Sequence, residues 1–277
     1  MWPRKTLEFL LVDMLKEMTL FGVRDKVEIA IQRMKEFEPP EGYLLAFSGG
    51  KDSVVCYYLA KMAGVKFVAH VAPTPDPPEL IRFRRKYFPD VIEEKCNKFT
   101  KRQAGGKFEG KPKNIFNLIA SRKTPPTRLI RYCCDELKEK VGNEGDTVIV
   151  GVRWAESSNR KKLSMVSMYK GKKMVRPIIE WTDEEVWEFI RTYNLPYCEL
   201  YDQGWDRLGC VGCPLSSNQM KEFEAYPKYK ENYIRAFDRM LRNLDNTSTW
   251  KTGEDVMEWW INKNKEKPLE GQCSMFE

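Results

Sequence analysis

Phe47-Ser-Gly-Gly-Lys-Asp-Ser53 is the stretch that decides the fold, because it joins a strand-like run to a helix-like one. The apolar run Tyr43–Phe47 leads into it, and Val54–Met62 follows with helix-compatible residues and length. A strand, a glycine-rich turn and a helix in this order point backbone N–H groups at an anion, and the helix N-terminus adds partial positive charge. The sequence therefore predicts a phosphate-binding loop at Ser48–Ser53.

The residue types of the Ser48–Ser53 loop suit this role. Gly49 and Gly50 let the backbone approach a ligand closely, Ser48 and Ser53 carry hydroxyl donors, and Lys51 supplies a point charge. The spacing is not that of the G-x-x-x-x-G-K-[ST] phosphate loop. The simpler alternative is an ordinary strand-to-helix turn.

Composition narrows the class of protein. The chain has 277 residues, of which 42% are hydrophobic, enough for a sizeable core. It has no apolar run of about 18 residues, so no membrane span is indicated. The first residues lack the charged-then-apolar layout of a signal peptide, and cytoplasmic residence is the default expectation.

Charge points to an anionic ligand. The net charge is +7, which suits a nucleotide or a nucleic acid. Ten Lys or Arg residues and one acid, Glu109, lie in the basic segment Lys98–Arg131. This segment is either a solvated loop or an anion-binding lid that closes over a nucleotide or contacts nucleic acid.

The cysteines and the histidine exclude several kinds of chemistry. Eight cysteines in a chain without export signals argue against a disulfide framework. The single histidine, His70, excludes Cys₂His₂ zinc sites and Ser-His-Asp or Cys-His catalysis.

Strand-like and helix-like stretches alternate along the middle of the chain, which predicts an α/β fold with an open, mainly parallel twisted sheet and helices on both faces. Ligands bind such sheets beyond the carboxyl ends of the strands. Thr182–Glu185 has the capping-box pattern and predicts a helix at Asp183–Tyr193. We expect a helical N-terminal segment at residues 1–40, with helices at Thr6–Leu20 and Arg24–Phe37, a nucleotide-binding domain at 41–215, and a helical C-terminal segment at 216–277.

Five stretches in order resemble the phosphoadenosine phosphosulfate (PAPS) reductase family of the PP-loop ATP pyrophosphatase superfamily. They are Ser48–Ser53, Thr74-Pro-Asp-Pro-Pro-Glu79, Arg131-Tyr-Cys-Cys-Asp-Glu-Leu-Lys138, Gly151-Val-Arg-Trp-Ala-Glu-Ser-Ser-Asn-Arg160 and Arg176–Trp187. The resemblance covers about residues 42 to 215 and is nearest to the form carried by phage and prophage genomes. It implies an adenine nucleotide alpha-hydrolase-like fold and an enzyme that binds ATP, or adenylylsulfate (APS) or PAPS.

The resemblance also implies a nucleotide site built from several stretches. Arg153 and Arg160 follow a strand, where guanidinium groups bind phosphate or sulfate bidentately. Asp52 or Asp76 is expected to ligate Mg²⁺. The expected site residues are Ser48, Gly49, Gly50, Lys51, Asp52, Ser53, Asp76, Gly151, Arg153, Glu156 and Arg160, with catalytic roles for Lys51, Asp52, Arg153 and Arg160. The alternative for the residues after Gly151 is a surface ion-pair set.

Cys133 and Cys134, followed by Cys210 and Cys213, form a possible Cys₄ set for an iron–sulfur cluster or zinc. Their spacing resembles the [4Fe–4S] site of APS reductases, and buried or redox-active thiols are the remaining alternative. Cys273 stands where those reductases carry a nucleophilic cysteine, but without their Glu-Cys-Gly-x-His pattern. It is either a nucleophile or an incidental thiol.

Three functions fit these features. The first is activation of an acceptor at the α-phosphate of ATP, with pyrophosphate release and sulfur transfer to an acceptor such as a nucleic acid. The second is reduction of APS or PAPS to sulfite through Cys273 and a thioredoxin-like reductant. The third is a nucleotide- or nucleic-acid-binding accessory without turnover, and any of the three allows a homodimer. The intact Ser48–Ser53 loop favours the first, because sulfonucleotide reductases usually carry a degenerate version of it.

Overall fold

The computed structural model describes residues 15–19, 22–103, 106–244 and 249–263. The chain divides into two compact units, which we describe separately. Unit 1 comprises the described residues up to Val71 together with Pro78–Glu93 and Gly142–Leu208. Unit 2 comprises Ala72–Pro77, Glu94–Val141 and the described residues from Gly209 onward.

Unit 1 contains a six-stranded open sheet with the strand order β5-β4-β3-β6-β8-β7. All neighbouring strands are parallel except β7, which runs antiparallel to β8 at one edge. The predicted mainly parallel α/β sheet is therefore confirmed. The strands are β3 Tyr43–Ala46, β4 Phe67–Val71, β5 Ile92–Glu93, β6 Thr147–Ile149, β7 Val166–Tyr169 and β8 Lys172–Val175.

The order of the strands places the Ser48–Ser53 loop at a switch point of the sheet. Strand β3 pairs with β4 on one side and with β6 on the other. The chain adds β4 and β5 on the first side before it returns, about a hundred residues after β3, to add β6 on the second. The segments that follow β3 and β6 therefore leave the sheet at the same edge, next to each other.

In the described part of unit 1, the helices that accompany this sheet are α2 Lys26–Glu36, α3 Lys51–Ala63, α4 Pro78–Tyr87 and α7 Asp183–Thr192. Helix α3 packs against both α2 and α7 and buries Val54, Val55 and Leu59 completely. The predicted capping box of α7 is present, since the side chain of Thr182 accepts from the Glu185 N–H and Glu185 accepts from the Thr182 N–H.

The N-terminal part differs from the sequence-based expectation. Most of the predicted helix Thr6–Leu20 lies outside the described residues, but Lys16–Thr19 forms strand β1, which pairs antiparallel with β2, Gly22–Asp25. The backbone of Lys16–Thr19 thus takes its hydrogen bonds from a neighbouring strand rather than from its own turn. The second predicted helix is present as α2, capped by Asp25.

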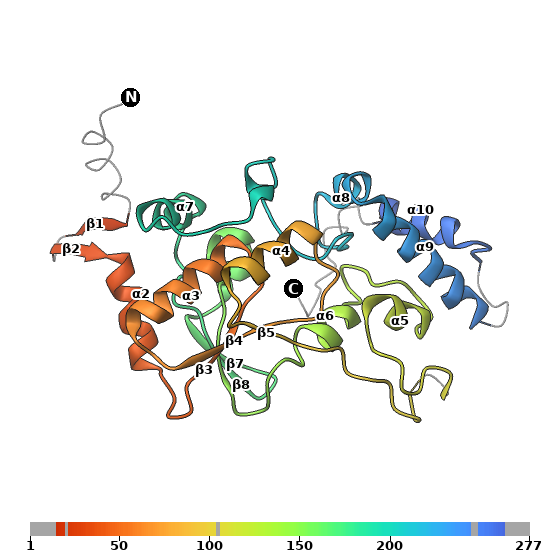
Figure 1. Cartoon of the computed structure of the whole chain (residues 1–277), viewed down its shortest axis with the longest axis horizontal. Coiled ribbons are helices and arrows are strands. Elements are labelled where there is room, and N and C mark those ends of the chain that lie inside the picture. Colours follow the sequence, from red (N-terminus) through yellow and green to blue (C-terminus); the bar gives the residue numbers. More distant parts are fainter. Residues whose placement is uncertain (1–14, 20–21, 104–105, 245–248, 264–277) are drawn as a thin grey trace. The chain divides into compact units, whose positions relative to one another are not determined.

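Unit 2 is mainly helical (Figure 1), and aromatic side chains are prominent in its core. Helix α9 packs against α5, α8 and α10. The core of unit 2 between these helices includes Phe223, Tyr233, Phe237 and Trp260. The helices are α5 Ile115–Ala120, α6 Tyr132–Leu137, α8 Gln219–Ala225, α9 Pro227–Arg242 and α10 Gly253–Lys263. Within the described part of the chain, no helix combines the length and apolarity that crossing a membrane requires.

We predict that Gly151→Ala destabilises unit 1. A Cβ at Gly151, just after β6, would lie 2.9 Å from the carbonyl carbon of Asp52 at the start of α3. The backbone must shift to relieve this overpacking, at a cost of about 1–3 kcal/mol. The midpoint temperature of thermal unfolding should therefore fall by roughly 5 °C. In Gly209→Ala the added Cβ meets nothing within 4 Å. That variant should unfold like the parent protein in the same calorimetric scan, and equal midpoints for the two variants would contradict the close packing.

Candidate nucleotide-binding site

The Ser48–Ser53 loop is held in shape by its own hydroxyl groups. The N–H groups of Ser48 and Gly49 donate to Ser53 Oγ at 3.2 and 3.0 Å. The Gly50 N–H donates to Ser48 Oγ at 3.2 Å, and the two hydroxyl oxygens lie 3.2 Å apart. Three successive N–H groups thus donate to one pair of hydroxyls, and Ser53 Oγ in turn donates to the carbonyl of Gly50 at 2.8 Å, so the loop is closed by its own hydrogen bonds.

Close approach of a neighbouring side chain explains Gly49, whereas Gly50 has room for a Cβ at nearly ordinary contact distances. Gly49 has φ of 82°, in the left-handed region, and a Cβ there would lie 2.7 Å from Arg84 Cγ. Arg84 donates to the carbonyl of Ser48 at 2.8 Å and so fixes the loop from α4. A Cβ at Gly50 would lie 3.5 Å from the hydroxyl of Tyr201, which accepts from the Lys51 N–H at 2.9 Å.

Lys51 opens α3 and is almost fully buried, with 6% of its surface exposed. Its Nζ lies 3.4 Å from Asp183 Oδ1 and donates to the carbonyl of Asp206 at 3.3 Å. The ammonium group therefore stays at the helix N-terminus, where it adds to the positive potential of the loop.

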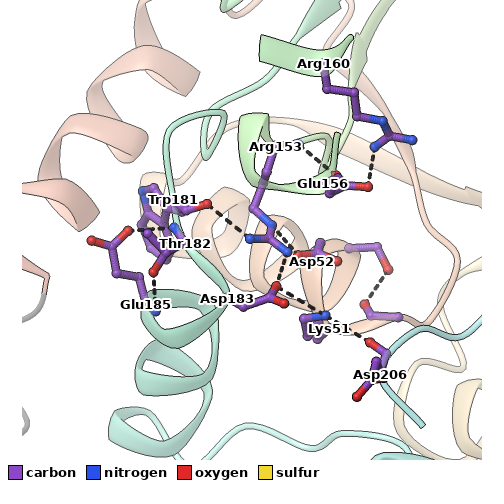
Figure 2. A network of polar contacts seen from close by, with 12 residues as sticks. Lys51, Asp52, Arg153, Glu156, Arg160, Trp181, Thr182, Asp183, Glu185 and Asp206 are labelled. Carbon is purple, nitrogen blue, oxygen red and sulfur yellow. Dashed lines mark hydrogen bonds and ion pairs between the residues drawn. The ribbon is translucent and has the colours of Figure 1, made fainter. Parts of the chain in front are cut away.

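Arg153 is the centre of the polar network in Figure 2. Only 2% of the residue is exposed. Its Nε donates to Asp52 at 2.6 Å, one terminal nitrogen donates to the carbonyl of Trp181 at 3.1 Å, and the other pairs with Asp183. The guanidinium is satisfied by protein acceptors and joins the starts of α3 and α7, rather than pointing a free fork at a ligand.

The two carboxylates bound to Arg153 are tuned in opposite directions. Burial raises the pKa of Asp52, although the charges of Arg153 and Lys51 oppose the shift. Burial would also raise the pKa of Asp183, but its hydrogen bond to Arg153 and the charge of Lys51 bring that pKa below its usual value.

Glu156 and Arg160 follow on two short 3₁₀ turns, Trp154–Glu156 and Arg160–Lys162. Glu156 accepts from the Arg153 N–H at 2.8 Å and pairs with the Arg160 guanidinium. The Arg160 side chain is 37% exposed, so it can reach a ligand in a way that Arg153 cannot.

The network contains residues that motif reading did not select as site residues. Asp183 lies within the capping box and so was assigned only a structural role, although it contacts both Lys51 and Arg153. Tyr201 and Asp206 carried no recognisable signal. Conversely, Asp76 belongs to unit 2, where it accepts a hydrogen bond from Thr74 at 2.9 Å.

The cysteine group, Cys133, Cys134, Cys210 and Cys213, lies entirely in unit 2. The hydrogen bond from Cys133 lowers the pKa of Cys134 to about 5. Burial raises the pKa of Cys210 to about 12, although Lys138 opposes that shift. Arg131 donates to Cys134 Sγ at 3.8 Å, and the charge of Cys210 raises the pKa of Lys138.

The cysteines differ in their surroundings but share one redox form. All seven described cysteines are free thiols, and Cys273 lies outside the described residues. No three His, Cys, Asp or Glu side chains of the described ranges converge closely enough to hold a metal ion. Four thiols are a donor set that suits a soft metal. Arg131 and Lys138 are the cations that would offset the charge of the thiolates.

Comparison with known proteins identifies the family. The sequence profile of the phosphoadenosine phosphosulfate reductase domain matches residues 42–216, more than half of the chain. The chain therefore belongs to the PAPS reductase family, as its motifs predicted.

Individual relatives are more distant. An adenosine 5′-phosphosulfate reductase from Staphylococcus epidermidis is 40% identical over 67 residues, 24% of this chain and 28% of that protein. An uncharacterized protein from Methanocaldococcus jannaschii is 29% identical over 206 residues, 70% of this chain and 47% of that protein. The aligned part is thus under half the length of these curated relatives. The crystal structure of PAPS reductase from Candida auris has a TM-score of 0.46 and 16% identity, covering 76% of this chain and 96% of that one.

We predict that Arg153→Gln costs roughly 2–4 kcal/mol of stability, because it removes the hydrogen bonds of the buried guanidinium and leaves the partly buried carboxylate of Asp52 without its closest cation. Arg160→Gln is the matched control and should change stability by about 0.5 kcal/mol or less, since its pair with Glu156 is partly exposed. Denaturant titration measures both.

The deficit of Arg153→Gln should shrink as pH falls below neutrality. The folded-state pKa of Asp52 is already raised, and losing Arg153 raises it further. Protonation of Asp52 therefore favours the folded state, with this stabilisation present at low pH and lost as pH rises through the folded-state pKa. A deficit that grows on acidification would contradict the assignment.

Proposed function

We propose that the protein binds ATP at the Ser48–Ser53 loop and activates an acceptor at the α-phosphate, releasing pyrophosphate. The observation that carries this proposal is the complete set of donors on the loop. Three N–H groups now donate to the Ser48 and Ser53 hydroxyls, and a phosphate that replaced these internal hydrogen bonds would meet all of these donors beside the ammonium group of Lys51. That many donors suit the β- and γ-phosphates of ATP better than the single sulfate of APS.

In the proposed step, a nucleophilic atom of the acceptor bonds to the α-phosphorus while the bond to the bridging oxygen breaks. Pyrophosphate leaves with that electron pair, and AMP stays attached to the acceptor. The loop and Lys51 offset the charge that develops on pyrophosphate, and Arg160 is the exposed cation that can reach the α-phosphate. Arg153 is a positioning residue for Asp52 and Asp183.

Mg²⁺ would bind together with the nucleotide phosphates. Asp52 fits this role, because its side chain is 25% exposed and its Oδ1 alone is engaged by Arg153. Asp76, the alternative carboxylate for this metal on the family resemblance, belongs to unit 2. Gly151 supports the site indirectly by letting the end of β6 approach Asp52.

The cysteine group gives the proposal its second half. We propose that Cys133, Cys134, Cys210 and Cys213 hold a [4Fe–4S] cluster, with zinc as the alternative metal. We also propose that a sulfur nucleophile at the oxidation level of sulfide then bonds to the activated acceptor while the bond to AMP breaks, and AMP leaves with that electron pair. Arg131 and Lys138 would offset the net negative charge of a cluster with four thiolates. Cys273 is the alternative thiol for this sulfur transfer.

A second candidate is supported by the named relatives and by the same cysteines. As an APS or PAPS reductase, the protein would use the Cys273 thiolate to attack the sulfonyl sulfur and expel the nucleotide phosphate. A thioredoxin-like dithiol would then reduce the enzyme thiosulfonate, releasing sulfite and becoming a disulfide. The accessory function without turnover is the third candidate.

Pyrophosphate release tests the first proposal. Cluster-replete protein should form pyrophosphate from ATP in the presence of its acceptor, and Lys51→Met should lower the rate roughly 100-fold, as for loss of one charge-stabilising group. Lys61→Met is the matched control, because Lys61 is an exposed lysine at the other end of α3. A screen of sulfate, tRNA and DNA supplies the acceptor.

The same preparations distinguish the alternatives. Sulfite formation from APS that survives Lys51→Met but is lost in Cys273→Ser would replace ATP activation with the reductase function. Tight nucleotide binding with neither product would leave the accessory function.

The cluster has its own test. Protein purified without oxygen should be brown, with broad visible absorption and about four iron atoms per chain. Cys210→Ser should lose the colour, whereas Cys96→Ser, a half-buried thiol elsewhere in unit 2, should keep it. A colourless protein with one zinc would exclude the iron–sulfur cluster.

A further inference from the structure

A pocket of about 200 Å³ opens within unit 2, in the region of the basic segment. Its volume is below the roughly 300–1,000 Å³ of sites for drug-sized ligands, so it suits a single small ring system rather than a whole nucleotide. It is lined by Phe99, Gln103, Lys113, Leu118, Ser121, Arg122 and Glu136.

One side of the pocket carries an ordered acceptor. The Nζ atoms of buried Lys113 and of Lys140 lie 3.0 and 2.9 Å from Glu136 Oε2. Both ion pairs use Oε2, which leaves Oε1 for a ligand. With two ammonium groups on Oε2, the Oε1 atom of Glu136 can accept from an amino group of a base.

Donors and flat surfaces complete the lining. Gln103 Oε1 accepts from the Thr100 N–H at 3.1 Å, which orients the side-chain amide and leaves its nitrogen as a donor. The guanidinium of Arg122 lies 5.4 Å from the ring centre of Tyr132 and is held there as a planar cation. Nucleobases stack on aromatic rings or guanidinium planes and hydrogen-bond along their edges, and this pocket offers both kinds of contact.

The surroundings of the pocket favour a polyanion over a small free ligand. Six exposed lysine and arginine side chains of the basic segment are near neighbours in sequence of the lining residues, and Glu109 is the single acid of the segment. The six are Lys98, Lys101, Arg102, Lys107, Lys111 and Lys123. The backbone that carries them is folded back on itself, since Phe99 and Lys111 are hydrogen-bonded at 3.0 Å and Lys113 donates to Asn97 at 2.7 Å. Such a set of cations exceeds what one small anion requires.

We propose that this pocket receives one nucleobase of a single-stranded or locally opened nucleic acid, while the exposed cations of the basic segment contact the neighbouring phosphates. Helix α6 supports this, because it carries Glu136 in the pocket wall and, within one turn, Cys133 and Cys134. An inserted base thus lies near the cysteine group in the same unit. This inference rests on the proposed function in one respect only, namely that the bound strand is the acceptor that ATP activates.

Fluorescence anisotropy of the full chain without ATP tests this inference. The probes are labelled single strands of RNA and DNA of about twelve nucleotides, and abasic strands with the same number of phosphates. The base-containing strand should bind on the order of tenfold more tightly than the abasic strand, since stacking and edge contacts need the base. Gln103→Ala should remove most of that difference without weakening the abasic strand.

The cations give the matched controls. Lys101→Ala should weaken both strands equally and reduce the slope of log affinity against log salt by about 1. Lys61→Ala, on unit 1, should change neither strand.

Three results would overturn the inference: equal affinity for intact and abasic strands, no strand binding at low salt, or displacement of the strands by polyglutamate of equal charge. The last would indicate an acidic protein partner. Because ATP is absent, strand binding without pyrophosphate release in the separate assay would refute the proposed function and leave this inference intact.

Discussion

The buried guanidinium of Arg153 is the interaction on which the arrangement of the nucleotide site depends. It follows β6 and binds Asp52 at the start of α3, the carbonyl of Trp181, and Asp183 at the start of α7. A buried charge is costly unless its hydrogen bonds are satisfied, and here they are provided from three parts of unit 1. The close approach at Gly151 brings these parts together. Lys51 and the Ser48–Ser53 loop are then fixed, because α3 begins in this network.

Local signals in the sequence were sufficient for the parallel sheet, the loop between β3 and α3, and the cap of α7. These features depend on neighbours within a few residues in sequence. Thr182 and Glu185 therefore identify the cap of α7 directly, and Gly49 and Gly50 identify the loop between β3 and α3. Strand order and the discontinuous unit 2 depend on contacts between distant segments, which no local pattern records. The same limit applies to Arg153, whose sequence context predicts a phosphate ligand. Only its partners, Trp181 and Asp183, indicate a positioning role and leave Arg160 as the exposed arginine.

The two units separate the chemistry that we assign to this family member. Unit 1 supplies the phosphate-binding loop, and unit 2 carries the four cysteines, their neighbouring cations and the basic segment. On our proposals, nucleotide activation takes place on the first unit, while sulfur chemistry and recognition of the acceptor strand belong to the second. The short helix α6 is central to this division, because Cys133, Cys134 and Glu136 lie on it.

The most direct test of the central claim is calorimetric titration of the protein with ATP and with AMP. If the Ser48–Ser53 loop holds the β- and γ-phosphates, ATP should bind at least roughly tenfold more tightly than AMP, as expected for a few charge-assisted hydrogen bonds. Lys51→Met should remove most of this difference. Equal affinity for ATP and AMP, together with tighter binding of APS, would contradict the account.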